Sequence, residues 1–234
     1  MREIALDTET TGLDPKSGHR VVEIGCIELI NHVPSGKVYH QYINPERDMP
    51  VEAERVHGLS VDFLSGHPVF ADIADAFVDF VGDAKLVIHN ASFDMGFINA
   101  ELSGVGMDMI PMARAIDTVT MARRKFPGAQ ASLDALCRRF GIDLSERSLH
   151  GALLDARLLA DVYLELLGGR QHGMDLAADA VAAMPQGALS DDATVSDAPT
   201  DGRRAPRPHA PSAAELALHA TFIESLTDPI WRRD

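Results

Sequence analysis

The sequence predicts an α/β fold, in which a three-strand antiparallel meander is followed by further strands that alternate with helices. The first three strand-like stretches are apolar or β-branched and are joined by short connections: residues 2–8, 20–30 and 37–43. After Pro68 the apolar residues recur at helical spacing. Two short apolar stretches, at 85–89 and near 116–117, are expected to extend the sheet.

The helices follow from apolar spacing and from signals at their ends. Val69, Ile73 and Phe77 recur as on one face of a helix, and a second helical pattern follows the strand at 85–89. Ser132 is typical of an N-cap and Gly141 of a C-terminal stop, so a helix is expected over 133–140. The periodic stretch 151–167 predicts a long helix that ends at a pair of glycines.

The composition changes after the last of these helices, so the folded domain is expected to span residues 1–169. Residues 170–211 are a predicted flexible linker, because 185–211 contain almost no large apolar side chains. Residues 212–234 contain an amphipathic helical pattern and the single tryptophan, Trp231. This tail is typical of a docking peptide, and the alternative is a helix that folds back onto the domain.

Composition and charge restrict the function. A chain of 234 residues, 46% of them hydrophobic, can bury one α/β core and carry an appendage. The net charge of −14 argues against a protein that coats nucleic acid with a basic surface, but it permits a small acidic site that binds cations. Cys26 and Cys137 lie in apolar patterns and are expected to be reduced core residues. Without a long apolar span or a secretory signal, we expect a cytoplasmic protein with no membrane partner.

Asp7 and Glu9 are the first candidate site residues. They stand one residue apart in a predicted strand and therefore project from the same face. Two carboxylates on one face of a buried strand repel each other unless a cation lies between them. Oxygen ligands suit Mg²⁺ or Mn²⁺. Taken alone, the pair could also be two solvated acids at the end of a strand.

Two further acids and a histidine lie in helical segments. Asp94 falls in the first turn of a helix, where a lone acid usually interacts with the helix dipole. Asp155 lies within a largely apolar helix, and acids are seldom buried without a partner. His150 is expected in the loop where that helix begins, with its ring over the site that Asp155 helps to form.

Three segments, in this order, resemble the motifs of the DEDDh 3′→5′ exonuclease family: Asp-Thr-Glu-Thr-Thr-Gly at 7–12, His-Asn-Ala-Ser-Phe-Asp at 89–94 and His-Gly-Ala-Leu-Leu-Asp-Ala at 150–156. Over residues 1–168 the chain looks most like the proofreading (epsilon) subunits of bacterial DNA polymerase III. The resemblance implies an RNase H-like fold, with a mixed five-stranded sheet flanked by helices. It also implies two divalent cations, Mg²⁺ or Mn²⁺, held by four acids: Asp7, Glu9, Asp94 and Asp155.

By this resemblance the chain removes nucleotides from a DNA 3′ end by two-metal catalysis, as the proofreading subunit of a replicative DNA polymerase III. His150 is the implied catalytic residue, because a neutral imidazole can take a proton from the attacking water. Two alternatives stay open. One is an RNA-trimming 3′→5′ exoribonuclease of the same family, and the other is a catalytically silent polymerase scaffold.

Further residues are expected to contact the substrate, a single-stranded or frayed DNA 3′ end. His57 lies in a segment that resembles the family's contact to the terminal nucleotide, although it could be a loop histidine bonded to the backbone. Asn90 could instead hold a strand-to-helix turn, Phe93 could be a core residue, and His89 is expected to be structural. Thr10 and Thr11 are expected to offer backbone amides. The expected substrate-binding set is Asp7, Glu9, Thr10, Thr11, Glu52, His57, Asn90, Phe93 and Asp155.

Partners are also implied by the resemblance. Residues 171–176, Gln-His-Gly-Met-Asp-Leu, are similar to a sliding-clamp-binding peptide, with a chance match as the alternative. The tail at 212–234 resembles the segment that binds the polymerase catalytic (alpha) subunit. The linker would then be a tether that raises the concentration of the exonuclease near the primer end.

Overall fold

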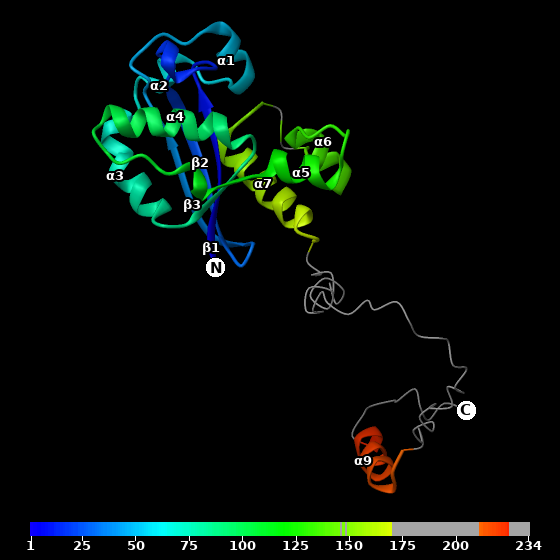
Figure 1. The fold of residues 1–234 in the computed structure, drawn as a ribbon. Coiled ribbons are helices and arrows are strands. Elements are labelled where there is room, and N and C mark those ends of the chain that lie inside the picture. Colours follow the sequence, from blue (N-terminus) through cyan, green and yellow to red (C-terminus); the bar gives the residue numbers. More distant parts are fainter. Residues whose placement is uncertain (146, 148, 170–210, 225–234) are drawn as a thin grey trace, which may run out of the picture. The chain divides into compact units, whose positions relative to one another are not determined.

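The computed structural model describes residues 1–145, 147, 149–169 and 211–224. Their five strands form one sheet with the order β3-β2-β1-β4-β5 (Figure 1). The strands are β1 (Arg2–Thr10), β2 (Val21–Ile30), β3 (Val33–Tyr42), β4 (Lys85–Ile88) and β5 (Ala115–Asp117). Strand β2 is antiparallel to both β1 and β3, whereas β4 is parallel to β1 and β5 is parallel to β4. The predicted mixed sheet with an antiparallel meander is confirmed.

The helices of the domain begin after β3 and then lie between and after the last two strands along the chain. They are α1 (Val51–His57), α2 (Val61–Leu64), α3 (Phe70–Val81), α4 (Ala91–Gly104), α5 (Thr118–Lys125), α6 (Leu133–Phe140) and α7 (Ala152–Leu166), with short 3-10 turns at Pro15–Ser17 and Met112–Arg114. The caps predicted for α6 are present: the hydroxyl of Ser132 accepts from the amide of Ala135, and Gly141 takes a left-handed conformation. The sequence did not predict α1, α2 or α5.

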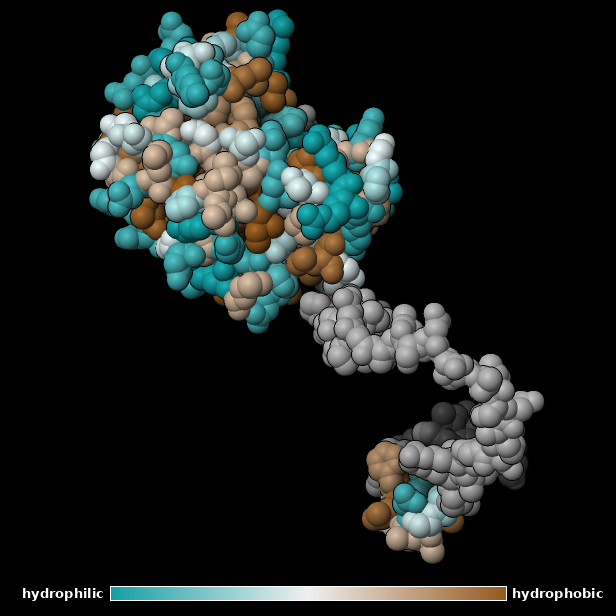
Figure 2. Space-filling model, in the orientation of Figure 1, coloured by the Kyte–Doolittle hydropathy of each residue, from teal (hydrophilic) through white to brown (hydrophobic). Residues whose placement is uncertain are grey.

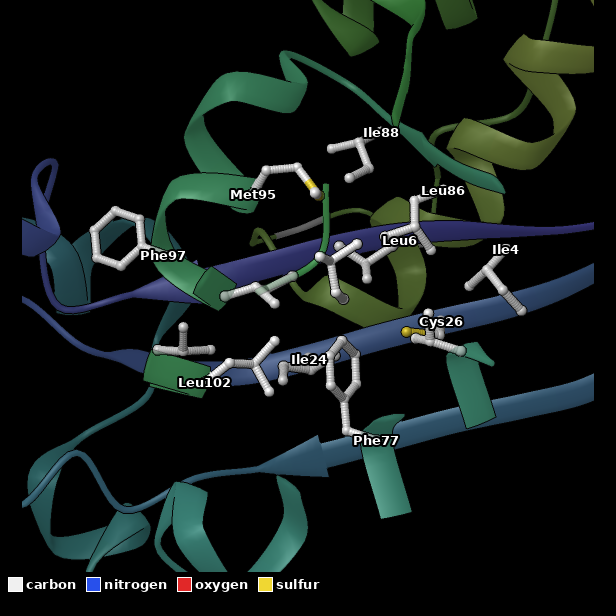
Figure 3. Close-up of a cluster of buried hydrophobic side chains, with 14 of the residues drawn as sticks. Ile4, Leu6, Ile24, Cys26, Phe77, Leu86, Ile88, Met95, Phe97 and Leu102 are labelled. Carbon is white, nitrogen blue, oxygen red and sulfur yellow. The ribbon is translucent and has the colours of Figure 1, made fainter. Parts of the chain in front are cut away.

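Alternating side chains of the strands build a separate core on each face of the sheet. Ile4 and Leu6 of β1 pack with Phe77 of α3 and Met95 of α4 (Figure 3). On the opposite face, Ala5 packs in a cluster with side chains of α5, α6 and α7. The two cysteines, one in each core, are buried and free, as the apolar patterns predict.

Gly25 allows the first turn of α7 to lie directly against the sheet. It is opposite Asp7 in the register of β1 and β2. A Cβ atom at Gly25 would lie 2.3 Å from the carbonyl carbon of Ala152 and from the amide nitrogen of Leu153. Because Gly25 has no side chain, α7 can begin beside the acidic half of β1. This close approach brings Asp155, in the first turn of α7, near the carboxylates of β1.

The chain divides into two units, Met1–Leu176 and Ala177–Asp234. In the second unit the structure describes α9 (Ala213–Glu224), where the predicted tail helix lies. Its first turn has a capping box, because the Ser212 hydroxyl accepts from the Glu215 amide and the Glu215 carboxylate accepts from the Ser212 amide. Three apolar side chains of this helix are more than half exposed: Leu216, Leu218 and Phe222. Figure 2 shows hydrophobic residues on the surface of the helix.

Three sequence-based expectations fall outside the described residues: most of the linker at 170–211, the segment 171–176, and Trp231. Among the helices that the structure describes, none is both long enough and apolar enough to cross a lipid bilayer.

Candidate active site

Carboxylates from three elements converge at the end of β1. Asp7 and Glu9 lie on the face of β1 that is covered by α7, and the ligand atoms of Glu9, Asp155 and His150 all lie within 4.8 Å of one another. Asp7, His150 and Asp155 line a cavity of about 410 Å³. The structure therefore brings the acidic pair of the first motif together with the acid and the histidine of the third.

Asp94 reaches the same site from the opposite face of the sheet. Its Oδ1 atom accepts hydrogen bonds from the amide of Thr8, at 3.1 Å, and from the hydroxyl of Thr8, at 2.7 Å. Thr8 lies between the two acids of β1 and points to the face that α4 covers. Asp94 is thereby fixed against the strand that carries Asp7 and Glu9, and it is buried.

Burial raises the pKa of Asp7, Glu9 and Asp94, and repulsion between carboxylates adds to the shifts of Asp7 and Glu9. Desolvation, and then the charges of Asp94 and Glu9, raise the pKa of Asp7 well above its ordinary value. Desolvation and the charge of Glu23 raise the pKa of Glu9 to about 8. Burial raises the pKa of Asp94 to about 7, against the lowering effect of its hydrogen bonds from Thr8. A cation at this position would offset the repulsion between these carboxylates and would favour their ionised forms.

His150 lies immediately before α7, where the sequence places it. Its Nδ1 atom is 3.3 Å from Oδ2 of Asp155, and half of its side chain is exposed. The backbone amide of His150 donates to the carbonyl oxygen of Val56 at 3.2 Å, which ties this loop to α1. The imidazole is thus next to the carboxylates and also open to solvent.

A second cavity, of about 560 Å³, lies beside Glu9. Most of the expected substrate-binding residues line it: Glu9, Thr10, Thr11, Glu52, His57 and Phe93. Phe93 also packs against the core and lies 5.0 Å, centroid to centroid, from the ring of Phe97. It therefore has both of the roles that the sequence left open for it, as a core residue and as part of a cavity wall.

His57 is the last residue of α1 and is buried. Its Nδ1 atom accepts from the amide of Leu59 at 3.0 Å, so the backbone-bonded alternative is observed. Its Nε2 atom is buried and has no hydrogen-bond partner among the described residues. Burial lowers the pKa of His57, which favours a neutral ring at the cavity.

The expected role of the Thr11 amide needs correction. That amide donates to the carbonyl oxygen of Arg20 at 2.9 Å, so it is already paired within the fold. The Thr11 hydroxyl accepts from the Arg20 amide, and the Thr10 hydroxyl donates to the carbonyl oxygen of Gly12. The two threonines shape the turn after β1, and a contact of the Thr10 amide with substrate stays a prediction.

Asn90 and His89 hold the segment before α4. Asn90 is in the left-handed region, with φ at 69°, and its backbone N–H donates to Oδ1 of Asp117 at 3.3 Å. This is the turn-supporting alternative, and Asn90 lines neither cavity. Nδ1 of His89 lies 2.9 Å from the Thr118 hydroxyl, a contact that fits a structural role, but His89 also lines the cavity of Asp7 and Asp155.

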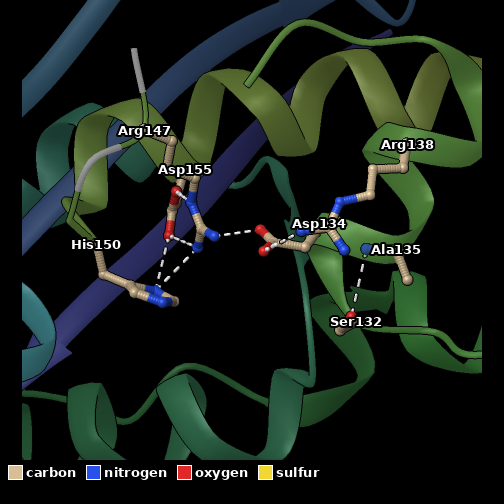
Figure 4. A network of polar contacts seen from close by, with 7 residues as sticks. All are labelled: Ser132, Asp134, Ala135, Arg138, Arg147, His150 and Asp155. Carbon is tan, nitrogen blue, oxygen red and sulfur yellow. Dashed lines mark hydrogen bonds and ion pairs between the residues drawn. The ribbon is translucent and has the colours of Figure 1, made fainter. Parts of the chain in front are cut away.

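Sequence reasoning missed two charged residues at the site. Glu23 lies opposite Glu9 in the register of β1 and β2, is buried, and has its Oε1 atom 2.7 Å from Nε2 of His40. Its signal was an acid within an apolar strand. Arg147 contacts Asp155 through two hydrogen bonds (Figure 4). No spacing rule predicts that contact.

Comparison with known proteins gives consistent results. Residues 4–163 match the exonuclease family RNase_T. The DNA polymerase III subunit epsilon of Rickettsia conorii is 57% identical over 179 residues, which are 75% of this chain and 78% of that protein. The protein of the same name from Escherichia coli K12 is 45% identical over 194 residues, or 80% of this chain and 79% of that protein.

Solved structures share the fold. The nuclease domain of 3′hExo, a DEDDh family member bound to rAMP, has a TM-score of 0.62 at 20% identity and covers 71% of this chain and 91% of that chain. Exonuclease X in complex with 5′ overhanging duplex DNA has a TM-score of 0.55 at 24% identity, over 71% of this chain and 90% of that chain. At such identities the similarity shows the fold alone, and it confirms the expected RNase H-like architecture.

Proposed function

Because this chain belongs to the exonuclease family RNase_T and is a 3′→5′ exonuclease related to DNA polymerase III epsilon subunits, we propose that four carboxylates form its metal site. They are Asp7, Glu9, Asp94 and Asp155. One observation carries the proposal: β1, α4 and α7 bring these acids to one place, where burial raises the pKa of Asp7, Glu9 and Asp94, and repulsion adds to the shifts of Asp7 and Glu9.

The donor set fits a pair of hard divalent cations. Carboxylate oxygens are the ligands that Mg²⁺ and Mn²⁺ prefer, and the positive charge would offset the repulsion among the acids. When bound, two such ions stabilise the charge that develops on the attacking and leaving oxygens of a phosphodiester. Glu9 and Asp155 lie together on the α7 side of β1, and Asp94 approaches from the α4 side.

The protein's own groups supply the remaining chemistry. His150, half exposed and beside Asp155, accepts the proton of the water that attacks the phosphorus atom. The bond from phosphorus to the leaving 3′ oxygen breaks, which leaves a shortened strand and a nucleoside 5′-monophosphate. The cavity lined by Thr10, Glu52 and His57 takes the terminal nucleoside, with Phe93 as an apolar wall.

The substrate that fits best is a frayed DNA 3′ end. A mismatched terminus costs less to separate from its template strand, so it enters such a cavity more readily than a paired one. The names of the relatives, which are polymerase subunits, favour DNA over the RNA-trimming alternative. All four acids and His150 are present, which argues against a silent scaffold.

The test is degradation of a 3′-mismatched DNA primer in Mg²⁺, with an RNA primer of the same sequence in parallel. Asp7→Asn and His150→Ala should each reduce the rate by at least about 100-fold, the range for loss of a catalytic group. Asp79→Asn, an exposed acid on α3, is the matched control and should match the wild type. Equal rates for the wild type and Asp7→Asn would refute the metal site, and faster cleavage of RNA would favour the exoribonuclease.

We also propose that the tail at 212–234 binds the polymerase catalytic (alpha) subunit, that residues 171–176 bind the sliding clamp, and that 170–211 connects them as a tether to the domain at 1–169. The exposed apolar side chains of α9 support the first of these roles. The clamp contact has only sequence similarity behind it. The cytoplasmic location stays a prediction.

A further inference from the structure

Arg147 places a permanent positive charge inside the cluster of carboxylates. Its Nε atom lies 2.6 Å from Oδ1 of Asp155, and its Nη2 atom lies 2.6 Å from Oδ2 (Figure 4). One guanidinium therefore engages both oxygens of one carboxylate. The Arg147 side chain is only 10% exposed and that of Asp155 only 3%. A bidentate pair of this kind is strong and specific in its geometry.

A divalent cation held by Asp155 needs oxygen atoms that Arg147 now occupies. The guanidinium would also repel the ion, because both are positive and share one carboxylate. We propose that Arg147 is an exchangeable internal cation, which pairs with Asp155 and moves off it as a divalent cation binds. This inference rests on the proposed function, because it takes Asp155 to be a metal ligand.

Asp134 offers Arg147 a second carboxylate. Nη1 of Arg147 already donates to Oδ1 of Asp134, which lies in the first turn of α6. The Asp134 side chain is 37% exposed, so it stays accessible to solvent while paired. Arg147 can leave Asp155 and remain bonded to Asp134, and its charge is then never buried without a partner.

The Arg147 guanidinium also decides which ring nitrogen of neutral His150 carries the proton. Nη2 of Arg147 lies 2.9 Å from Nδ1 of His150. A guanidinium can only donate, so Nδ1 must be the acceptor, and the neutral ring then carries its proton on Nε2. After Arg147 leaves, Nδ1 can donate to Oδ2 of Asp155, which is 3.3 Å away. Nε2 then has a free lone pair, so one exchange opens the metal ligand and prepares the base.

Binding of Mn²⁺ to the full chain without DNA, followed by electron paramagnetic resonance of the free ion, tests this exchange. Arg147→Gln should bind Mn²⁺ roughly tenfold more tightly, within the range of ordinary coupling between two sites. Arg147→Lys keeps the charge but not the two-pronged contact, and should fall between Arg147→Gln and the wild type. Arg138→Gln is the matched control, because Arg138 pairs with Asp134, at 3.5 Å, and forms no ion pair with Asp155 among the described residues. Unchanged or weaker binding by Arg147→Gln overturns the proposal.

A second readout separates movement of Arg147 from its charge alone. In the ¹H–¹⁵N spectrum, the Nε–H signal of Arg147 is the one that Arg147→Lys lacks. In the wild type it should shift during a Mg²⁺ titration, with the midpoint of Mg²⁺ binding. A signal that stays unchanged at saturating Mg²⁺ overturns the exchange even if the affinities differ.

The two hypotheses fail in different ways. If the wild type does not bind Mn²⁺, or if Asp7→Asn does not weaken binding, the proposed function itself is refuted. If the wild type binds through Asp7 and Arg147→Gln binds no more tightly, only the role of Arg147 is refuted.

Discussion

The buried carboxylates of the site differ in their partners, and the partners decide what each can do. Asp94 is fixed by two neutral donors of Thr8, whereas Asp155 is paired with the guanidinium of Arg147. Glu9 faces another acid, Glu23, across the strand pair. These acids are therefore not equivalent: one is anchored, one is neutralised, and one is strained by a like charge.

Glu9 should make the stability of the folded chain depend on pH in the presence of a chelator. Its pKa rises from 4.5 to about 8 on folding, so between these values the folded state holds a proton that the unfolded state has released. The contribution of Glu9 to stability is therefore fully present below pH 4.5, falls as the pH rises from 4.5 to about 8, by up to about 1.4 kcal/mol per pH unit for one proton, and levels off above that pH.

Glu9→Gln cannot ionise and should flatten this fall, as measured by urea unfolding in EDTA at pH 5, 6.5 and 8. Glu52→Gln, an exposed glutamate at the same cavity, is the control and should follow the wild type. Equal slopes for the wild type and Glu9→Gln would contradict the assignment to Glu9.

The hydroxyl of Thr8 should contribute measurably to the free energy of unfolding of the domain. Thr8→Val removes a 2.7 Å hydrogen bond to a buried carboxylate, and it leaves the shape of the side chain almost unchanged. We expect a loss of about 1.5–3 kcal/mol in the free energy of unfolding at pH 8, the range for hydrogen bonds to charged groups. Thr8→Ser retains the hydroxyl and should lose much less. If the two variants are equally stable, the hydroxyl is not what holds Asp94.

At the scale of elements, the sequence predicted the strands and helices in which apolar residues recur at a regular spacing. Strands β1, β2 and β4, and helices α3, α4, α6 and α7, bury apolar side chains, and α6 carries both of its end signals. By contrast, α1 is a seven-residue helix that begins after Pro50 with no side-chain cap. Its position comes from distant contacts, such as the one between Val56 and His150, which local sequence does not reveal.

The candidate site was likewise predictable where its residues stand in a regular pattern, and not where they depend on distant packing. Asp7 and Glu9 share a face because a strand has a period of two, and Asp155 stands out as an acid in an apolar helix. The contact of Arg147 with Asp155 depends on the path of the loop between α6 and α7. That path follows from packing, and no local pattern encodes it.

Gly25 tests how closely α7 must approach the sheet. Gly25→Ala would place a Cβ atom 2.3 Å from backbone atoms of Ala152 and Leu153, so the first turn of α7 has to move. We expect a loss of about 1–3 kcal/mol in the free energy of unfolding, as for overpacked cores, together with reduced nuclease activity.

Gly96→Ala is the matched control for this change. Gly96 lies within α4 with open space around its Cβ position, so alanine there should be neutral or should stabilise the chain by about 0.5–1 kcal/mol. Urea unfolding measures both. A Gly25→Ala protein as stable and as active as the wild type would show that the approach of α7 is not critical.

At the scale of the whole molecule, the negative net charge of the chain opposes the binding of the proposed substrate, DNA. A chain with a net charge of −14 repels the DNA backbone at long range, so diffusion alone brings the two together slowly. Cations bound by the acidic cluster reverse the sign of the field only locally. A docking tail on a tether would supply what the surface lacks, because it keeps the domain near the primer end at high effective concentration.

One face of the tail helix α9 should bind the polymerase catalytic subunit. Leu218 and Phe222 are one helical turn apart on the same face of α9 and are 72% and 58% exposed. The double variant Leu218→Asp, Phe222→Asp should reduce binding to the purified polymerase catalytic subunit by at least about tenfold, because two apolar anchors become charges. Its activity on a free 3′ end should equal that of the wild type. Ala217→Asp adds a charge about 100° around the helix from both Leu216 and Leu218, and this variant should bind normally. If the double variant still binds the polymerase as the wild type does, this face of α9 is not the docking surface.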